Sequence, residues 1–132
     1  MSYEIFVQRF EHGDAPPMPA AAFRTILGPH VDRTGPEFDF WHIRVADGGE
    51  ADLYAHIADL TVSGVMVSRF STGTLLDLVV EFTQAANAVI LMPGCPTLLV
   101  DEEQRQHLPD ELRADALVIA TGADVTAALA AC

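Results

Sequence analysis

Apolar side chains recur along the chain with two different periods, which divide it into strands and helices. Alternation of apolar and polar residues, rich in β-branched and aromatic types, predicts strands, and in the first of them Ile5 and Val7 face the same way. Apolar residues at helical spacing predict helices, and Pro19 suits the first turn of one. Strands are predicted over residues 3–10, 38–46, 51–58, 64–70, 88–92, 97–100 and 116–120, helices over 19–27, 74–87, 101–108 and 122–131, and a helical turn over 110–115.

Two of the helices carry start signals. Thr74-Leu75-Leu76-Asp77 has the form of a capping box in front of an apolar run. The helix that follows is apolar almost all round, so we expect it to be the most buried one, and Asn87 suits its end. Asp101 is placed to cap the helix over 101–108.

The segments 38–46 and 51–58 predict a β-hairpin around Asp47-Gly48-Gly49. Their apolar sets face the same way if Val45 pairs with Ala51 and Ile43 with Leu53, which leaves residues 47–49 as the loop. On the other face this register places three further pairs opposite each other: Arg44 with Asp52, His42 with Tyr54, and Phe40 with His56.

Three consecutive strands joined by short turns require antiparallel pairing, and the helices around them are isolated. The prediction is one α+β domain over residues 1–132, with a mixed, largely antiparallel sheet and helices packed on one face. A ferredoxin-like core with additions is the leading topology.

Composition narrows the classes of partner. The 132 residues include 19 acidic and 7 basic side chains, for a formal charge of -12. That balance disfavours binding to nucleic acid through phosphate neutralisation and binding to an anionic membrane. The chain start does not follow the signal-peptide pattern, and the apolar stretch over 75–80 is far too short to cross a bilayer. A cytoplasmic protein without a cofactor is the expectation.

Cysteine supplies one candidate for catalysis. Cys95 follows a predicted buried strand in Met92-Pro93-Gly94-Cys95-Pro96, and a nucleophilic cysteine needs a histidine, a cation or a helix N-terminus to lower its pKa. No histidine accompanies it at a fixed spacing, so a rigid turn with a small apolar thiol is the favoured interpretation. The only other cysteine is Cys132, and a bridge between the two stays open.

The second face of the hairpin is the stronger candidate for a site. Aromatic, imidazole and guanidinium side chains together supply contact area and directional bonds, as recognition surfaces need. The competing interpretation covers this face with the loops 11–17 and 28–37 and places Phe40 in a second small core. His42 and His56 share the face, but no metal site is predicted from so loose a set. The candidate binding residues are Phe40, His42, Arg44, Asp52, Tyr54 and His56, extended by Arg69.

Three segments carry a resemblance. Met1 to Phe10, Pro93-Gly94-Cys95-Pro96 and His107-Leu108-Pro109 resemble features of small hypothetical proteins of high-GC actinobacteria, a group with no assigned activity. Small acidic α+β proteins of this kind are also broadly similar to bacterial immunity proteins. The resemblance brings no catalytic residues with it.

The sequence therefore predicts a non-enzymatic binding module, an inhibitor or immunity-like protein that acts on a protein partner. Local acid pairs at 102–103 and 110–111 fit a solvated surface or a basic partner. Two alternatives remain: a small enzyme or ligand-binding protein that uses Cys95 with a nearby histidine, and a homodimer that covers a sheet edge.

Overall fold

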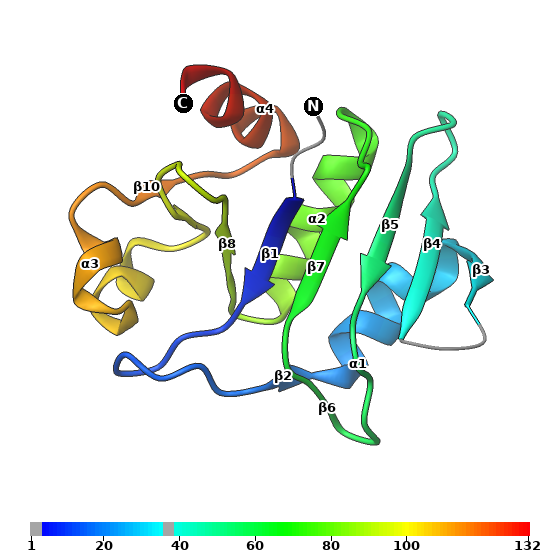
Figure 1. The fold of residues 1–132 in the computed structure, drawn as a ribbon, viewed down its shortest axis with the longest axis horizontal. Helices are drawn as coiled ribbons and strands as arrows, with labels where there is room; N and C mark the ends of the chain where they lie inside the picture. The colour runs from blue at the N-terminus through cyan, green and yellow to red at the C-terminus, as the bar shows by residue number, and fades with distance from the viewer. Residues whose placement is uncertain (1–3, 36–38) are drawn as a thin grey trace.

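The computed structural model describes residues 4–35 and 39–132 and places the larger part of the strands in one sheet (Figure 1). The sheet has eight strands in the order β10-β9-β8-β1-β7-β5-β4-β3, antiparallel throughout except between β10 and β9. Its strands are β1 (Glu4–Gln8), β3 (Val31–Thr34), β4 (Phe40–Arg44), β5 (Glu50–Tyr54), β7 (Val65–Ser68), β8 (Val89–Leu91), β9 (Leu98–Leu99) and β10 (Leu117–Val118). A separate pair joins β2 (Met18–Pro19) to β6 (Thr61–Val62).

The helical segments connect these strands. They are α1 (Ala20–Ala22), a π-helical turn η1 (Phe23–Leu27), a 3₁₀ turn η2 (Gly28–His30), α2 (Thr74–Ala85), a 3₁₀ helix η3 (Glu102–His107), α3 (Asp110–Arg113) and α4 (Gly122–Ala131). The predicted α+β class with a mixed, mostly antiparallel sheet is confirmed. No helix in the described ranges is long and apolar enough to cross a membrane.

Strand alternation builds the core as predicted. Ile5 and Val7 of β1 are fully buried, and Val65 and Val67 of β7 lie opposite them. Because successive side chains of a strand point to opposite faces, these residues define one inner face of the sheet. In Figure 1, α1 and α2 lie behind this sheet, and α2 contributes buried Leu75, Leu76 and Phe82, among others, to the main core.

Four strands in the middle of the sheet lie side by side as β8-β1-β7-β5. Along the chain they occur in the order β1, β5, β7 and β8, with α1 between β1 and β5 and with α2 between β7 and β8. This is the β-α-β-β-α-β order that a ferredoxin-like core uses. Strands β3 and β4 are inserted before β5, and the segment from β9 to α4 follows β8. The assignment to that topology stays a prediction.

The helix predicted to start at Thr74 does begin there, but its predicted capping box is wrong. The N-cap of α2 is Gly73, with a φ of 71° and no side-chain cap. Asp77 instead accepts a hydrogen bond of 2.8 Å from the backbone N–H of Gly122, the first residue of α4. The carboxylate therefore caps a neighbouring helix, because the two helices meet there. The predicted cap at Asp101 is confirmed, since its carboxylate accepts from the N–H of Glu103 at 2.9 Å.

The hairpin forms, but its predicted register is wrong by two residues. Ile43 pairs with Ala51 and Trp41 with Leu53. The turn begins earlier than predicted, because the N–H of Val45 donates to the carbonyl of Gly49 at 2.8 Å, and Asp47 accepts from the N–H of Gly49 at 2.8 Å. A slip of two residues leaves each side chain on its predicted face, so the division into inner and outer sets survives.

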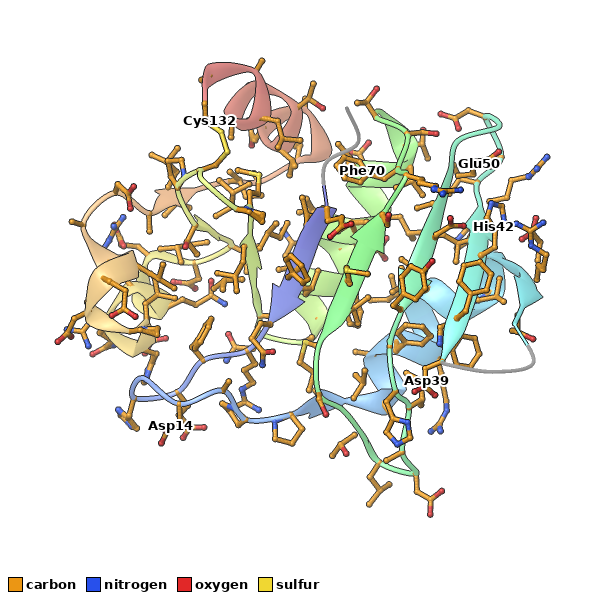
Figure 2. All side chains as sticks on the ribbon, viewed as in Figure 1. Asp14, Asp39, His42, Glu50, Phe70 and Cys132 are labelled. Carbon is orange, nitrogen blue, oxygen red and sulfur yellow. A yellow bond between two sulfur atoms is a disulfide. The ribbon has the colours of Figure 1, made fainter. Side chains whose placement is uncertain are left out.

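Two further differences concern the ends of the sheet. Part of the loop predicted over 28–37 is the edge strand β3, and Phe38, predicted to begin a strand, lies outside the described residues. At the other end, Cys95 and Cys132 form a disulfide with their Cα atoms 5.6 Å apart. The bridge that the sequence left open ties the end of α4 to the turn between β8 and β9 (Figure 2).

Candidate functional site

The outer face of the sheet is the candidate site. Along β1, β7, β5 and β4 the inner face carries the helices, whereas no helix lies in front of these strands in Figure 1. The loop 11–17, one of the two segments considered as a cover, contacts His107 instead, through the N–H of Gly13 and the carbonyl of His107 at 2.9 Å. Part of the other segment, residues 31–34, forms the edge strand β3 beside β4, and its residues 36–37 lie outside the described ranges. The competing interpretation of a covered hairpin face is therefore not supported for the described residues.

One row of apolar side chains crosses this outer face. Cross-strand pairing aligns Leu91 with Phe6, Phe6 with Met66, Met66 with Tyr54, and Tyr54 with Phe40. The rings of Phe40 and Tyr54 lie 5.4 Å apart, and Tyr54 is 39% exposed. We call these five residues the apolar row. Its members come from five strands, so the row exists only in the folded sheet.

A second row runs beside the first, two residues along each strand. It joins Glu4 to Ser68, Ser68 to Asp52, and Asp52 to His42. Arg44 pairs with Glu50 two residues further along β4. The outer face thus presents an apolar row next to a polar one, in which two of the four residues are acidic.

The structure brings most of the predicted binding residues together. Phe40, His42 and Arg44 project from β4, and Asp52 and Tyr54 project from β5, on the same outer face. His56 lies beyond the end of β5 with its side chain 71% exposed, next to Asp39 at 3.2 Å. Arg69 follows β7 and is exposed, with a left-handed φ of 50°. These two lie at the ends of their strands, outside both rows.

His42 is the centre of an ionic cluster on this face (Figure 2). Its side chain is 6% exposed, with Nδ1 at 2.6 Å from Asp32 Oδ1 and Nε2 at 3.2 Å from Glu50 Oε1. Arg44 lies 3.6 Å from a carboxylate oxygen of each of these two acids. With both ring nitrogens facing carboxylates, only the imidazolium can donate to both partners at once.

The hydrogen bond with Asp32 is the main cause that raises the pKa of His42, and the same bond lowers the pKa of Asp32. A raised histidine pKa contributes stability that is complete below the unfolded value of about 6.5 and is lost as pH rises through the folded value. A lowered aspartate pKa contributes stability above about 3.8 that is lost as pH falls through the folded value.

We therefore expect His42→Gln to destabilise the protein most between about pH 4 and pH 6.5, because the network is fully charged there. The difference in unfolding free energy between wild type and His42→Gln, measured by urea titration, should be smaller at pH 9 than at pH 6.5. A difference that grows across that interval would contradict the assigned charge states. His56→Gln is the matched control, since His56 is exposed, and it should show a small difference at every pH.

The catalytic candidate, Cys95, is bonded to another cysteine in the structure. The sulfur of Cys95 is bonded to that of Cys132, and none of the hydrogen bonds within the described ranges joins Cys95 to a histidine. Nor do His42 and His56 converge, because the first is held by Asp32 and Glu50 and the second by Asp39. Among the described residues, no group of three or more histidine, cysteine or acidic side chains is placed to hold a metal ion.

Three members of the apolar row were missed at the level of sequence. Phe6, Met66 and Leu91 alternate with core residues in their strands, so their outward direction was predictable. Their alignment with Tyr54 was not, because it depends on the strand order β8-β1-β7-β5. Comparison of the chain with protein-family models, with curated proteins and with solved structures gave no match.

Proposed function

We propose that the chain is a non-enzymatic binding module, an inhibitor or immunity-like protein, that docks a protein partner on its outer sheet face. The observation that carries the proposal is the continuous apolar row over β8, β1, β7, β5 and β4. Interfaces between proteins commonly have an apolar, aromatic centre with a polar rim. Here the row supplies the centre, and the row from Glu4 to His42 supplies the rim on one side.

Charge supports a basic partner. The chain carries a formal charge of -12, and Glu4 and Asp52 lie beside the apolar row. Complementary charges raise the rate of association and suppress wrong partners. Since exposed charges are screened at high ionic strength, the encounter with a basic partner should weaken as salt is added.

Replacing Met66 with aspartate should abolish the docking. Met66 lies in the middle of the apolar row, and a buried charge at the centre of an interface typically costs at least 2 kcal/mol, or about 30-fold in affinity. The measurement is quantitative capture of proteins from the native host on immobilised wild type, Met66→Asp and Gln84→Asp. Gln84 is exposed on α2, on the other side of the sheet, and serves as the matched control.

A basic protein held by wild type and Gln84→Asp, lost with Met66→Asp and released by salt, is the expected result. Retention by all three proteins would sink the proposal, and the loss with Met66→Asp counts as support because thermal melting is used to show that this variant is folded. If the only species captured is the chain itself, the outer face is a homodimer interface and the partner is not a different protein.

The expected cytoplasmic location stays part of the proposal, and the disulfide bears on it. Disulfides persist chiefly in oxidising compartments and are rare in the cytosol. A thiol-alkylation experiment distinguishes a reducing compartment from an oxidising one. Thiols are alkylated in freshly lysed host cells, and the peptides with Cys95 and Cys132 are analysed by mass spectrometry. Modified thiols indicate a reducing compartment, and unmodified, bridged cysteines indicate an oxidising one.

A further inference from the structure

A second feature of the molecule lies on the inner side of β4, away from the outer face. A cavity of about 780 Å³ is lined by Phe23, Arg24, Gly28, Val31, Asp39, Trp41 and Ile57. Its volume lies in the range of small-molecule sites, about 300–1,000 Å³. The lining comes from η1, η2, β3, β4 and the segment after β5, so several elements meet around it.

Two aromatic rings form a fixed corner of this cavity. Phe23 and Trp41 meet at 63° with their centroids 5.6 Å apart. The indole N–H of Trp41 donates to the carbonyl of Ala55 at 3.0 Å, and Phe82 packs against Phe23 at 6.1 Å. Both rings are therefore held in place before any ligand arrives. Phe23 is only 2% exposed and meets Trp41 edge to face, so it backs the indole, and Trp41 is the aromatic surface that the cavity offers to an organic cation.

A carboxylate completes the corner. Asp39 lines the cavity with its side chain 48% exposed, and its ionic partner is the exposed imidazole of His56 at 3.2 Å. The cation on the lining, Arg24, donates to the carbonyls of Asp59 at 2.9 Å and of Ala58 at 3.4 Å. Its donors are thus partly engaged by the chain, while the carboxylate faces an exchangeable partner. The net charge of -12 also favours cations over anions throughout the surroundings.

The backbone around the cavity departs from regular geometry in two places. Phe23 and Arg24 lie in a π-helical turn, a form that is rare and concentrated at functional sites. Asp39 adopts a left-handed φ of 55°, which is uncommon for residues other than glycine. Both departures place side chains on the cavity lining.

We propose that this cavity is a binding site for a small organic ammonium ion. The indole of Trp41, backed by Phe23, takes the alkylated nitrogen, and Asp39 supplies the opposite charge. The site is independent of the outer face, since Trp41 belongs to the inner side of β4, with Leu53 opposite it. A partner protein and an ammonium ligand could therefore be bound at the same time.

Trp41 is the single tryptophan of the chain, so its fluorescence and its indole N–H resonance report on the cavity directly. Choline, its neutral isostere 3,3-dimethylbutan-1-ol, and the anion 3,3-dimethylbutyrate are titrated in turn. Because only the cation gains a cation–π contact and the attraction of the carboxylate, choline should bind at least tenfold more tightly than the neutral isostere. Asp39→Asn should weaken choline binding at least fivefold and leave the neutral isostere unchanged.

Asp115→Asn is the matched control, since Asp115 is exposed in the turn before β10, and it should leave all three titrations unchanged. Equal affinity for choline and its isostere would reduce the cavity to an apolar pocket and overturn the proposal. Tighter binding of the anion would make Arg24 the anchor and overturn it as well. No saturable change with any of the three compounds would also overturn it, since Trp41 lines the cavity.

Discussion

Removing the disulfide should lower the unfolding free energy of the oxidised protein by about 3–4 kcal/mol, as expected from loop closure. Cys95 and Cys132 are 37 residues apart in sequence, so the bridge closes a loop that holds β9, η3, α3, β10 and α4. An unfolded chain without the bridge gains the freedom of that whole loop. The double variant Cys95→Ser/Cys132→Ser, measured by urea unfolding, provides the value.

Two controls accompany this experiment. Wild type unfolded in the presence of a reductant should match the double variant, and the variant itself should not respond to the reductant. Hydrogen exchange distinguishes a global loss of stability from opening of α4 alone. Equal unfolding free energies for wild type and variant under oxidising conditions would contradict the bridge as a stabilising link.

Gly122→Ala should destabilise the protein by about 2–4 kcal/mol, the sum of overpacking and a weakened hydrogen bond to a charged group. A Cβ atom at Gly122 would lie 2.5 Å from the backbone N of Asp77 and 2.7 Å from the backbone C of Leu76. Those atoms belong to α2, which is buried in the core and cannot yield. The 2.8 Å bond from Gly122 N–H to Asp77 would lengthen as α4 moves away.

Gly64→Ala is the matched control for this prediction. A Cβ atom there would meet Gln8 Oε1 at 2.9 Å, which is the end of a flexible side chain. Because Gln8 can rotate, the cost should stay below about 1 kcal/mol. Thermal unfolding of the two variants measures the contrast. Equal melting temperatures for Gly122→Ala and wild type would show that α4 is not packed against α2 at this point.

The sequence predicts which face of the sheet a side chain points to better than it predicts which residue lies opposite it on the next strand. Alternation identifies Ile5 and Val7 as core, and it assigns Phe40, His42 and Arg44 to one outer face. Both results depend on the geometry of a single strand. The hairpin slip of two residues went undetected because both registers keep the same faces and both allow glycine in the turn.

The features that the sequence does not predict depend on contacts between segments that are far apart in the chain. The residues Asp32, Arg33 and Thr34 of the edge strand β3 are polar and exposed, so their segment shows no alternation. Asp77 looked like a capping residue of its own helix, whereas it caps α4, 45 residues further along the chain. The apolar row and the cavity beside Trp41 likewise combine residues from distant segments, and no local pattern reports such meetings.

The central claim is that the apolar row on the outer face docks a basic protein. Its most direct test is site-specific photo-crosslinking in the native host, with a photoreactive amino acid at position 66 or, as the control, at position 84. The account predicts a crosslink to one basic protein from position 66 and none to that protein from position 84. Crosslinks that are the same from both positions, or absent from position 66, would contradict it.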